Sequence, residues 1–236
     1  MSTGPANVVL VHGAQHGSWC WERVVPLLEG RGLRVTTVDL PSTGPEGDER
    51  PSLADDVAAV RAALDAVDGQ KLLVGHSYGG TVITAAAAGR DDVSRLVYLC
   101  AAMPDAGESG ASLFERAGID ASWLIMDGGL MLPNREAAGE LFFGDCDPAT
   151  REAAIERLRP MSLVPHGELV PEAGWHAIPS TYVVCTLDQA IPPDVQRGLF
   201  APRAEEVIEL EASHSPFYSQ PEAVAGLLAD RARAEA

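Results

Sequence analysis

The pentapeptide Gly75-His76-Ser77-Tyr78-Gly79 is the strongest chemical signal in the sequence. It follows the apolar run KLLV and precedes the helical stretch GGTVITAAAA, so the serine stands on a turn between a strand and a helix. A serine on so tight a turn takes a strained backbone conformation, and the residues two positions to either side must lack side chains to avoid collision. The pattern therefore predicts that Ser77 is a nucleophile.

A serine hydroxyl at neutral pH needs a base at hydrogen-bond distance that takes its proton. Among the six histidines, His214 directly follows the last predicted strand, which is where a base is found in the chain order serine, acid, histidine. Asp188 follows the preceding strand, and we expect it to hold the imidazole in the correct tautomer and to stabilise the imidazolium. Asp105 competes for this role, because it too follows a strand.

The same chemistry needs two backbone N–H groups directed at the developing oxyanion. One is expected from Tyr78. The other is expected from the loop after the first strand, whose small residues let the backbone approach a substrate closely, and Ala14 is the candidate. We interpret His12 in this loop as a structural residue that fixes the loop by hydrogen bonds.

Short β-branched runs alternate with helical patterns along the chain, which is typical of βα units on a mostly parallel sheet. Six strands are predicted, at residues 8–11, 34–40, 71–74, 95–100, 181–186 and 206–210. Ser52 is expected to cap a helix whose apolar residues face the sheet. The pattern predicts one α/β domain with a mostly parallel sheet of about six strands flanked by helices.

The alternation breaks between Pro104 and Trp175, where helical patterns and turns occur without a convincing strand. We therefore expect a core of residues 1–103 and 176–236 and a helical cap, residues 104–175, inserted between strands. Such a cap would lie over the site and shape a pocket. Its aromatic residues either line that pocket or pack the cap onto the core: Phe114, Trp123, Phe142 and Phe143.

Composition excludes several classes of partner. The formal charge of −17, from 17 Lys+Arg against 34 Asp+Glu, would repel nucleic acids and anionic membranes. Four cysteines stand far apart with no CxxC pair, so we expect reduced, mostly buried thiols and no metal site. The amino-terminal sequence has no basic segment, and its apolar run is too short for a signal or a membrane span, so we expect a cytoplasmic protein.

The sequence resembles the α/β-hydrolase superfamily, and within it the branch of bacterial EstC-like carboxylesterases, plant methylesterases and plant hydroxynitrile lyases. The resemblance runs nearly end to end, through VLVHGAQHGSWCW, VVPLLEGRGLRVTTVDL, LLVGHSYGG, LVYLCAAMPD, LFFG, RLRPMSLVP, YVVCTLDQAIPPDVQR and ASHSPFYSQP. It implies the α/β-hydrolase fold, a catalytic triad of Ser77, Asp188 and His214, and oxyanion donors at Ala14 and Tyr78. We expect a bacterial protein, and the oligomeric state stays open, although related enzymes often form homodimers.

Two positions separate esterases from lyases in this branch. The plant lyases carry a threonine after the first-loop histidine and a lysine after the catalytic histidine, whereas this chain has Gly13 and Ser215 there. Without an ammonium to stabilise departing cyanide, cyanohydrin cleavage loses its main electrostatic contribution. The resemblance therefore favours an esterase.

The leading hypothesis is a serine carboxylesterase that cleaves a small to medium hydrophobic ester through an acyl-enzyme and needs no metal or organic cofactor. The expected partner is the small-molecule ester alone. The same triad would also serve a lactonase, a thioesterase, a C–C hydrolase or a tailoring enzyme of specialised metabolism, and a ligand-binding receptor or a lyase ranks lower. The candidate substrate-binding residues are Gly13, Trp123, Leu130, Phe142 and Tyr218.

Overall fold

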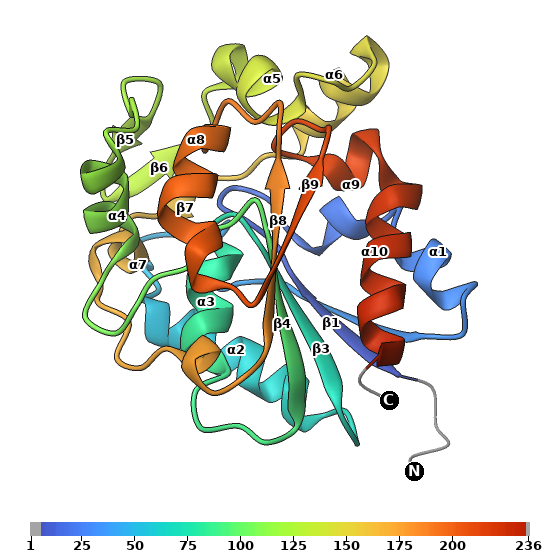
Figure 1. Cartoon of the computed structure of the whole chain (residues 1–236). Coiled ribbons are helices and arrows are strands. Elements are labelled where there is room, and N and C mark those ends of the chain that lie inside the picture. Colours follow the sequence, from blue (N-terminus) through green and yellow to red (C-terminus); the bar gives the residue numbers. More distant parts are fainter. Residues whose placement is uncertain (1–5, 235–236) are drawn as a thin grey trace.

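A six-stranded sheet forms the centre of the molecule (Figure 1). The structure is a computed structural model that describes residues 6–234. Its strands are β1 (Asn7–Val11), β2 (Arg34–Val38), β3 (Lys71–His76), β4 (Val93–Leu99), β8 (Ser180–Cys185) and β9 (Glu206–Leu210). They are ordered β2-β1-β3-β4-β8-β9, and every neighbouring pair is parallel. The predicted fold class is confirmed, and each predicted strand is present within about two residues of its expected ends.

Helices cover both faces of the sheet because its central strands are apolar on both sides. Successive residues of β1 alternate between two clusters: Val9 packs with α2 and α3, whereas Val8 packs with α1 and α10. Figure 1 shows these two helix layers on opposite sides of the strands. The helices are α1 (Val25–Glu29), α2 (Leu53–Asp65), α3 (Gly79–Ala86) and α10 (Pro221–Ala234). Ser52 caps α2 as expected, since its side chain accepts a hydrogen bond from the Asp55 N–H.

Short elements occupy the loops around this core. They are η1 (Ser18–Trp21), η2 (Gly174–His176), α8 (Pro193–Val195), η3 (Gln196–Phe200), η4 (Ala201–Arg203) and α9 (Pro216–Ser219). All four cysteines are free and buried, as the sequence predicted. No helix within residues 6–234 is both long and apolar enough to cross a membrane.

Most of the segment between β4 and β8, from α4 to α7, gathers at the end of the sheet where the strands finish (Figure 1). It contains α4 (Gly110–Ala117), β5 (Ile125–Asp127), β6 (Leu130–Leu132), α5 (Arg135–Phe143), α6 (Pro148–Glu156), β7 (Met161–Ser162) and α7 (Val164–Gly167). The expectation of no strand here was wrong, because β5, β6 and β7 form a small antiparallel sheet. Strands of two or three residues are too short to show an alternating pattern. The Gly128-Gly129 turn between β5 and β6, with φ of 54° and 80°, is the signal that marks the hairpin.

Backbone contacts fix this cap on the loops of the core. The Ser162 N–H donates to the carbonyl of Ser42, and the Arg159 N–H donates to the carbonyl of Gln15. The Gln15 side chain in turn donates to the carbonyl of Met131 on β6. These hydrogen bonds with the cap therefore fix the position of the loop after β1, which is expected to supply an oxyanion donor.

Candidate active site

The turn between β3 and α3 has the geometry that the sequence predicted for a nucleophile. Ser77 has a φ of 51°, a left-handed conformation that non-glycine residues rarely adopt. A Cβ atom on Gly75 would lie 2.6 Å from the Gly79 carbonyl oxygen, and one on Gly79 would lie 2.6 Å from that of His12. Gly80 is under the same constraint, since its Cβ would lie 2.1 Å from the carbonyl oxygen of Ala102. The sequence reasoning named the first two glycines and missed the third.

Three side chains from separate loops meet at this turn. His214 Nε2 lies 2.9 Å from Ser77 Oγ, and His214 Nδ1 lies 2.7 Å from Asp188 Oδ2. Because a carboxylate can only accept, the imidazole hydrogen is on Nδ1 and Nε2 is free to accept the serine proton. Both His214 and Asp188 are buried. This is the arrangement in which a histidine acts as general base for a serine.

Asp188 is held by four hydrogen bonds. Besides His214, its donors are the N–H groups of Ala190 and Ile191, at 2.8 and 2.9 Å from Oδ1, and Gln196 Nε2, at 2.9 Å from Oδ2. Gln196 is fully buried and also accepts from the N–H of Cys185. Sequence reasoning missed Gln196, because a single glutamine in a short helical turn carries no periodic or motif signal.

Asp105, the competing acid, lies elsewhere. Its Oδ1 atom is 2.8 Å from Nε2 of His176, and both side chains are substantially exposed. This pairing lowers the pKa of Asp105. Asp105 therefore forms a surface pair with His176, and the carboxylate beside His214 is that of Asp188.

The two expected oxyanion donors lie at the nucleophile. Ala14 and Tyr78 line the same cavity as Ser77, and within residues 6–234 neither backbone N–H donates to another backbone group. The Tyr78 amide precedes the first turn of α3, where N–H groups have no partner inside the helix and favour negative charge. The Tyr78 side chain points into the core, where its hydroxyl donates to Asp56 Oδ2 at 2.6 Å.

Buried histidines surround the site without adding charge to it. His12 donates from Nδ1 to the carbonyl of Gly13 and accepts at Nε2 from the Leu40 N–H, so it fixes its loop as expected. His76 donates from Nε2 to the carbonyl of His214 at 2.7 Å and so holds the loop that carries the base. Burial lowers the pKa of His12 to about 4 and that of His16 to about 3, so both are neutral at pH 7.

The cap also holds the loop of the base. The N–H of Ser213 donates to Asp145 Oδ2 at 3.0 Å, and its hydroxyl donates to Oδ1 of the same carboxylate. Asp145 follows α5, so the cap and the loop after β9 are joined one residue before His214. No sequence pattern pointed to Asp145.

A cavity of about 370 Å³ opens above Ser77 and beneath the cap. Its walls are mainly apolar side chains of α4, the loop from α4 to β5, the β5–β6 hairpin, α5, the residue after β7 and the loop after Asp188: Ala111, Phe114, Ile119, Ala121, Trp123, Leu124, Met126, Met131, Phe142, Leu163, Ala190 and Ile191. Trp123 and Phe142 line it as expected, and so does Phe114. Phe143 is fully buried and packs the cap onto the core.

Three of the expected substrate-binding residues lie outside the cavity wall. Leu130 alternates with Met131 along β6, and Met131 is the one that faces the cavity. Tyr218 is buried against Trp19, and its hydroxyl donates to Glu22 at 2.8 Å, so its role is to pack the core. Gly13 does not line the cavity but lies beside the nucleophile, because a Cβ there would be 2.8 Å from that of Ser77.

One group of potential metal ligands exists within the described residues: His76, Cys100 and His214. His214 is engaged at both ring nitrogens, and His76 and Cys100 each donate to its carbonyl oxygen. Burial raises the pKa of Cys100 well above its ordinary value, which disfavours the thiolate that a metal would need. These residues fit a hydrogen-bond network better than a metal centre.

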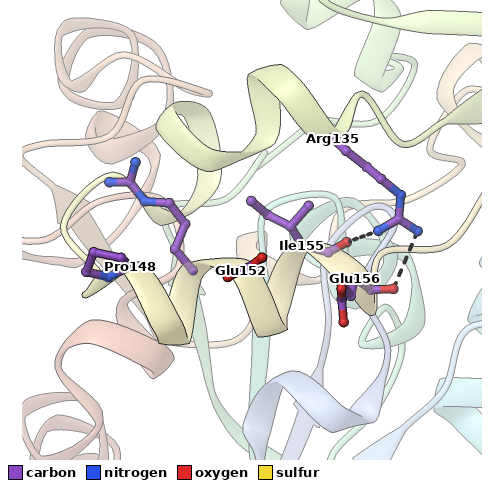
Figure 2. Close-up of a pocket in the computed structure, with 6 residues that line it drawn as sticks. Arg135, Pro148, Glu152, Ile155 and Glu156 are labelled. Atoms are coloured by element: carbon purple, nitrogen blue, oxygen red, sulfur yellow. Dashed lines mark hydrogen bonds between the residues drawn. The ribbon is translucent and has the colours of Figure 1, made fainter.

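A second hollow, of about 590 Å³, lies between α5 and α6, and Figure 2 shows the side chains that line it. Its residues are Arg135, Pro148, Arg151, Glu152, Ile155 and Glu156, and none of them lines the cavity over Ser77. Arg135 donates to the carbonyls of Ile155 and Glu156 at the end of α6. These bonds join the two helices, as basic side chains do at helix carboxyl ends.

Comparisons with known proteins agree with this geometry. Residues 8–227 match the model of the alpha/beta hydrolase family. The chain is 34% identical to a pyrethroid hydrolase of Sphingobium wenxiniae, over 98% of this chain and 89% of the relative, and 30% identical to Methylesterase 7 of Arabidopsis thaliana, over 93% and 94%. Among solved structures, a pyrethroid hydrolase from Sphingobium faniae superposes with a TM-score of 0.82 at 29% identity, covering 97% of this chain and 98% of that one. Polyneuridine aldehyde esterase superposes with a TM-score of 0.86 at 26% identity, over 96% and 99%.

Proposed function

Because the chain belongs to the α/β-hydrolase family, we propose that it hydrolyses carboxylic esters of small to medium hydrophobic substrates through an acyl-enzyme on Ser77. The observation that carries this proposal is the chain of two hydrogen bonds that links Ser77, His214 and Asp188. Ser77 Oγ lies 2.9 Å from His214 Nε2, and His214 Nδ1 lies 2.7 Å from Asp188 Oδ2. The relatives include hydrolases of pyrethroids and plant methylesterases, which supports an ester as the bond cleaved.

The geometry accounts for each proton in the reaction. Ser77 Oγ attacks the ester carbonyl carbon while its proton moves to Nε2 of His214, and the oxyanion accepts hydrogen bonds from the N–H groups of Ala14 and Tyr78. The carbon–oxygen bond to the alcohol then breaks, and the alcohol leaves with the proton from His214. Water attacks the acyl group, gives a proton to His214 and releases the acid, while Ser77 recovers its hydrogen.

The residues around Ser77 favour hydrolysis over the alternatives. The apolar cavity suits the hydrophobic part of an ester, and Trp123 and Phe142 shape its wall. A threonine at position 13 would bring its Cβ within 2.7 Å of His76 Nδ1, so the side chain that lyases carry there does not fit. A lactonase, thioesterase or C–C hydrolase would use the same residues, but the named relatives do not favour them.

Covalent labelling tests the nucleophile directly. We expect a fluorophosphonate to add one adduct to Ser77 and to abolish hydrolysis of p-nitrophenyl butyrate, and we expect Ser77→Ala to lose labelling and at least about 10³-fold in kcat/KM. Ser94→Ala, at the opposite end of the parallel strands, is the matched control and should retain both. Full activity in the Ser77→Ala protein would refute the proposal.

We also propose that the enzyme is cytoplasmic. We propose further that it needs no metal ion or organic cofactor, since no step of the reaction above calls for one. Activity of the purified protein should therefore be the same before and after prolonged dialysis against EDTA. A loss that Zn²⁺ or Mg²⁺ restores would contradict this part of the proposal.

A further inference from the structure

Three polar atoms in the residues that line the cavity have no hydrogen-bond partner within the described part of the chain: His16 Nε2, Thr81 Oγ1 and His166 Nε2. Thr81 Oγ1 and His166 Nε2 are both buried and form no hydrogen bond within residues 6–234. Both residues line the cavity above Ser77. Because an unpaired buried polar atom destabilises the fold, such atoms call for a specific explanation, and a ligand that pairs with them is one.

The two residues flank the same aromatic side chain. Thr81 is on the first turn of α3, three residues after Tyr78, so their side chains are neighbours on the helix surface. The ring of His166 lies 5.0 Å from the ring of Tyr78. Thr81 and His166 therefore belong to one part of the cavity wall, although they are 85 residues apart in the sequence.

Three other polar residues of the cavity have partners within the protein. Ser77 and His214 bond each other, and the hydroxyl of Tyr78 bonds Asp56. His16 Nε2 is also unpaired, but its ring is enclosed by the aromatic rings of Trp19, His76, Phe142, Phe143 and Phe217, whose centroids lie 5.4 to 6.0 Å away. Apart from the carboxylate of Glu115 at the exposed edge, Thr81 and His166 are thus the groups left to recognise a polar part of a substrate.

The electrostatics of the wall favour an uncharged group. Among the described residues that line the cavity, none is a lysine or an arginine, and Glu115 adds a negative charge at its exposed edge. Burial lowers the pKa of His166 to about 4, so its imidazole is neutral at pH 7. A threonine hydroxyl and a neutral imidazole can each donate or accept, so together they match a hydroxyl, which donates one hydrogen bond and accepts another.

We propose that Thr81 and His166 form a second binding subsite for a hydroxyl group of the substrate, so that the preferred substrate is a neutral, largely apolar ester that is hydroxylated away from the scissile bond. This inference rests on the proposed ester hydrolysis and names its substrate class. Thr81 follows the nucleophile by four residues, slightly more than one helical turn or roughly 6 Å, which places the hydroxyl several bonds from the ester carbonyl.

Three matched esters test the subsite: methyl phenylacetate, methyl 4-hydroxyphenylacetate, and the analogue with a 4-carboxylate in place of the hydroxyl. We expect kcat/KM to be about tenfold higher for the hydroxyl ester than for the unsubstituted one, the size of one net hydrogen bond, and lowest for the carboxylate. Thr81→Val and His166→Phe should each bring the ratio of kcat/KM for the hydroxyl ester to kcat/KM for the unsubstituted ester close to one. Thr81→Ser should keep this ratio at about ten.

Phe114→Leu is the matched control, because it alters the same wall without removing a polar atom. It should change kcat/KM for both uncharged esters by the same factor and leave their ratio intact. Melting temperatures of all variants show whether a loss reflects unfolding. The proposed subsite would be refuted if the two uncharged esters had nearly equal kcat/KM in the unmodified enzyme. It would also be refuted if neither Thr81→Val nor His166→Phe lowered the ratio of these two values.

Binding to the Ser77→Ala protein separates this inference from the proposed reaction. In that variant the affinity for the hydroxyl ester should exceed that for the unsubstituted ester by about tenfold, and Thr81→Val should abolish the difference. A clear difference in affinity without any turnover by the unmodified protein would sink the proposed function and keep the subsite. Ester turnover by the unmodified protein, with equal affinities of the Ser77→Ala protein for the two esters, would refute the subsite and keep the proposed function.

Discussion

Replacing Gln196 by methionine should show how much stability and activity depend on the hydrogen bonds that hold Asp188, while Asp188 itself stays in place. The Gln196 side chain accepts from the N–H of Cys185 at 3.0 Å and donates to the carbonyl of Ile191 at 2.7 Å and to Asp188 Oδ2 at 2.9 Å. Methionine has nearly the same shape but can make none of these bonds. The variant therefore leaves one buried donor and two buried acceptors without that partner, and it also removes the longer contact, at 3.5 Å, from Gln196 Nε2 to the Cys185 carbonyl oxygen.

The expected cost follows from these three bonds. Two neutral hydrogen bonds contribute about 1 kcal/mol each and one to a carboxylate about 2 kcal/mol, so the Gln196→Met protein should lose about 4 kcal/mol of unfolding free energy. For a chain of this length that lowers the melting temperature by roughly 8 to 16 °C. Gln189→Met is the matched control, because Gln189 is exposed and the same substitution there should change the melting temperature by little.

The effect on catalysis should be much smaller than removal of the acid. Asp188 keeps its bonds to His214 and to the N–H groups of Ala190 and Ile191 in the variant, so His214 stays oriented. We expect kcat for p-nitrophenyl butyrate to fall about tenfold in Gln196→Met, against about 10⁴-fold in Asp188→Asn. This reasoning would be refuted if kcat fell equally in Gln196→Met and Asp188→Asn, or if the Gln196→Met protein had the same melting temperature as Gln189→Met.

Two further predictions concern the turn and its support. Gly80→Ala should destabilise the protein strongly, because its Cβ would lie 2.1 Å from the Ala102 carbonyl oxygen, whereas Gly226→Ala in α10 has open space and should raise the unfolding free energy by about 0.5 to 1 kcal/mol in a denaturant titration. Tyr78→Phe should cost about 2 kcal/mol at pH 8, since Asp56 then loses a hydroxyl donor. Burial already raises the pKa of Asp56 in the folded protein above its ordinary 3.8, so the folded state favours the protonated carboxyl, and stability falls as the pH rises through that pKa. The cost of Tyr78→Phe should therefore grow as the pH rises through the pKa of Asp56 in the folded protein, and a cost that stays constant from pH 4 to pH 8 would contradict this reasoning.

The sequence by itself determined the parallel sheet and the turn that carries Ser77. Both are marked by local patterns: β-branched runs favour strands, and the Cβ of a residue at position 75 would collide with the Gly79 carbonyl inside the turn itself. The collisions at Gly79 and Gly80 involve the more distant backbone of His12 and Ala102, so they are decided by the fold. The short β5–β6 hairpin was missed although Gly128-Gly129 marked it, because its strands are too short for an alternating pattern.

Tertiary structure decided which side chains surround the site. Gln196 and Asp145 support Asp188 and the loop of His214 through contacts that no spacing reveals. Leu130 and Tyr218 were expected at the cavity and lie outside it, because the side-chain direction in a strand and the packing of a buried phenol depend on distant neighbours. Local sterics thus position the nucleophile, whereas contacts between residues far apart in the chain shape the space above it.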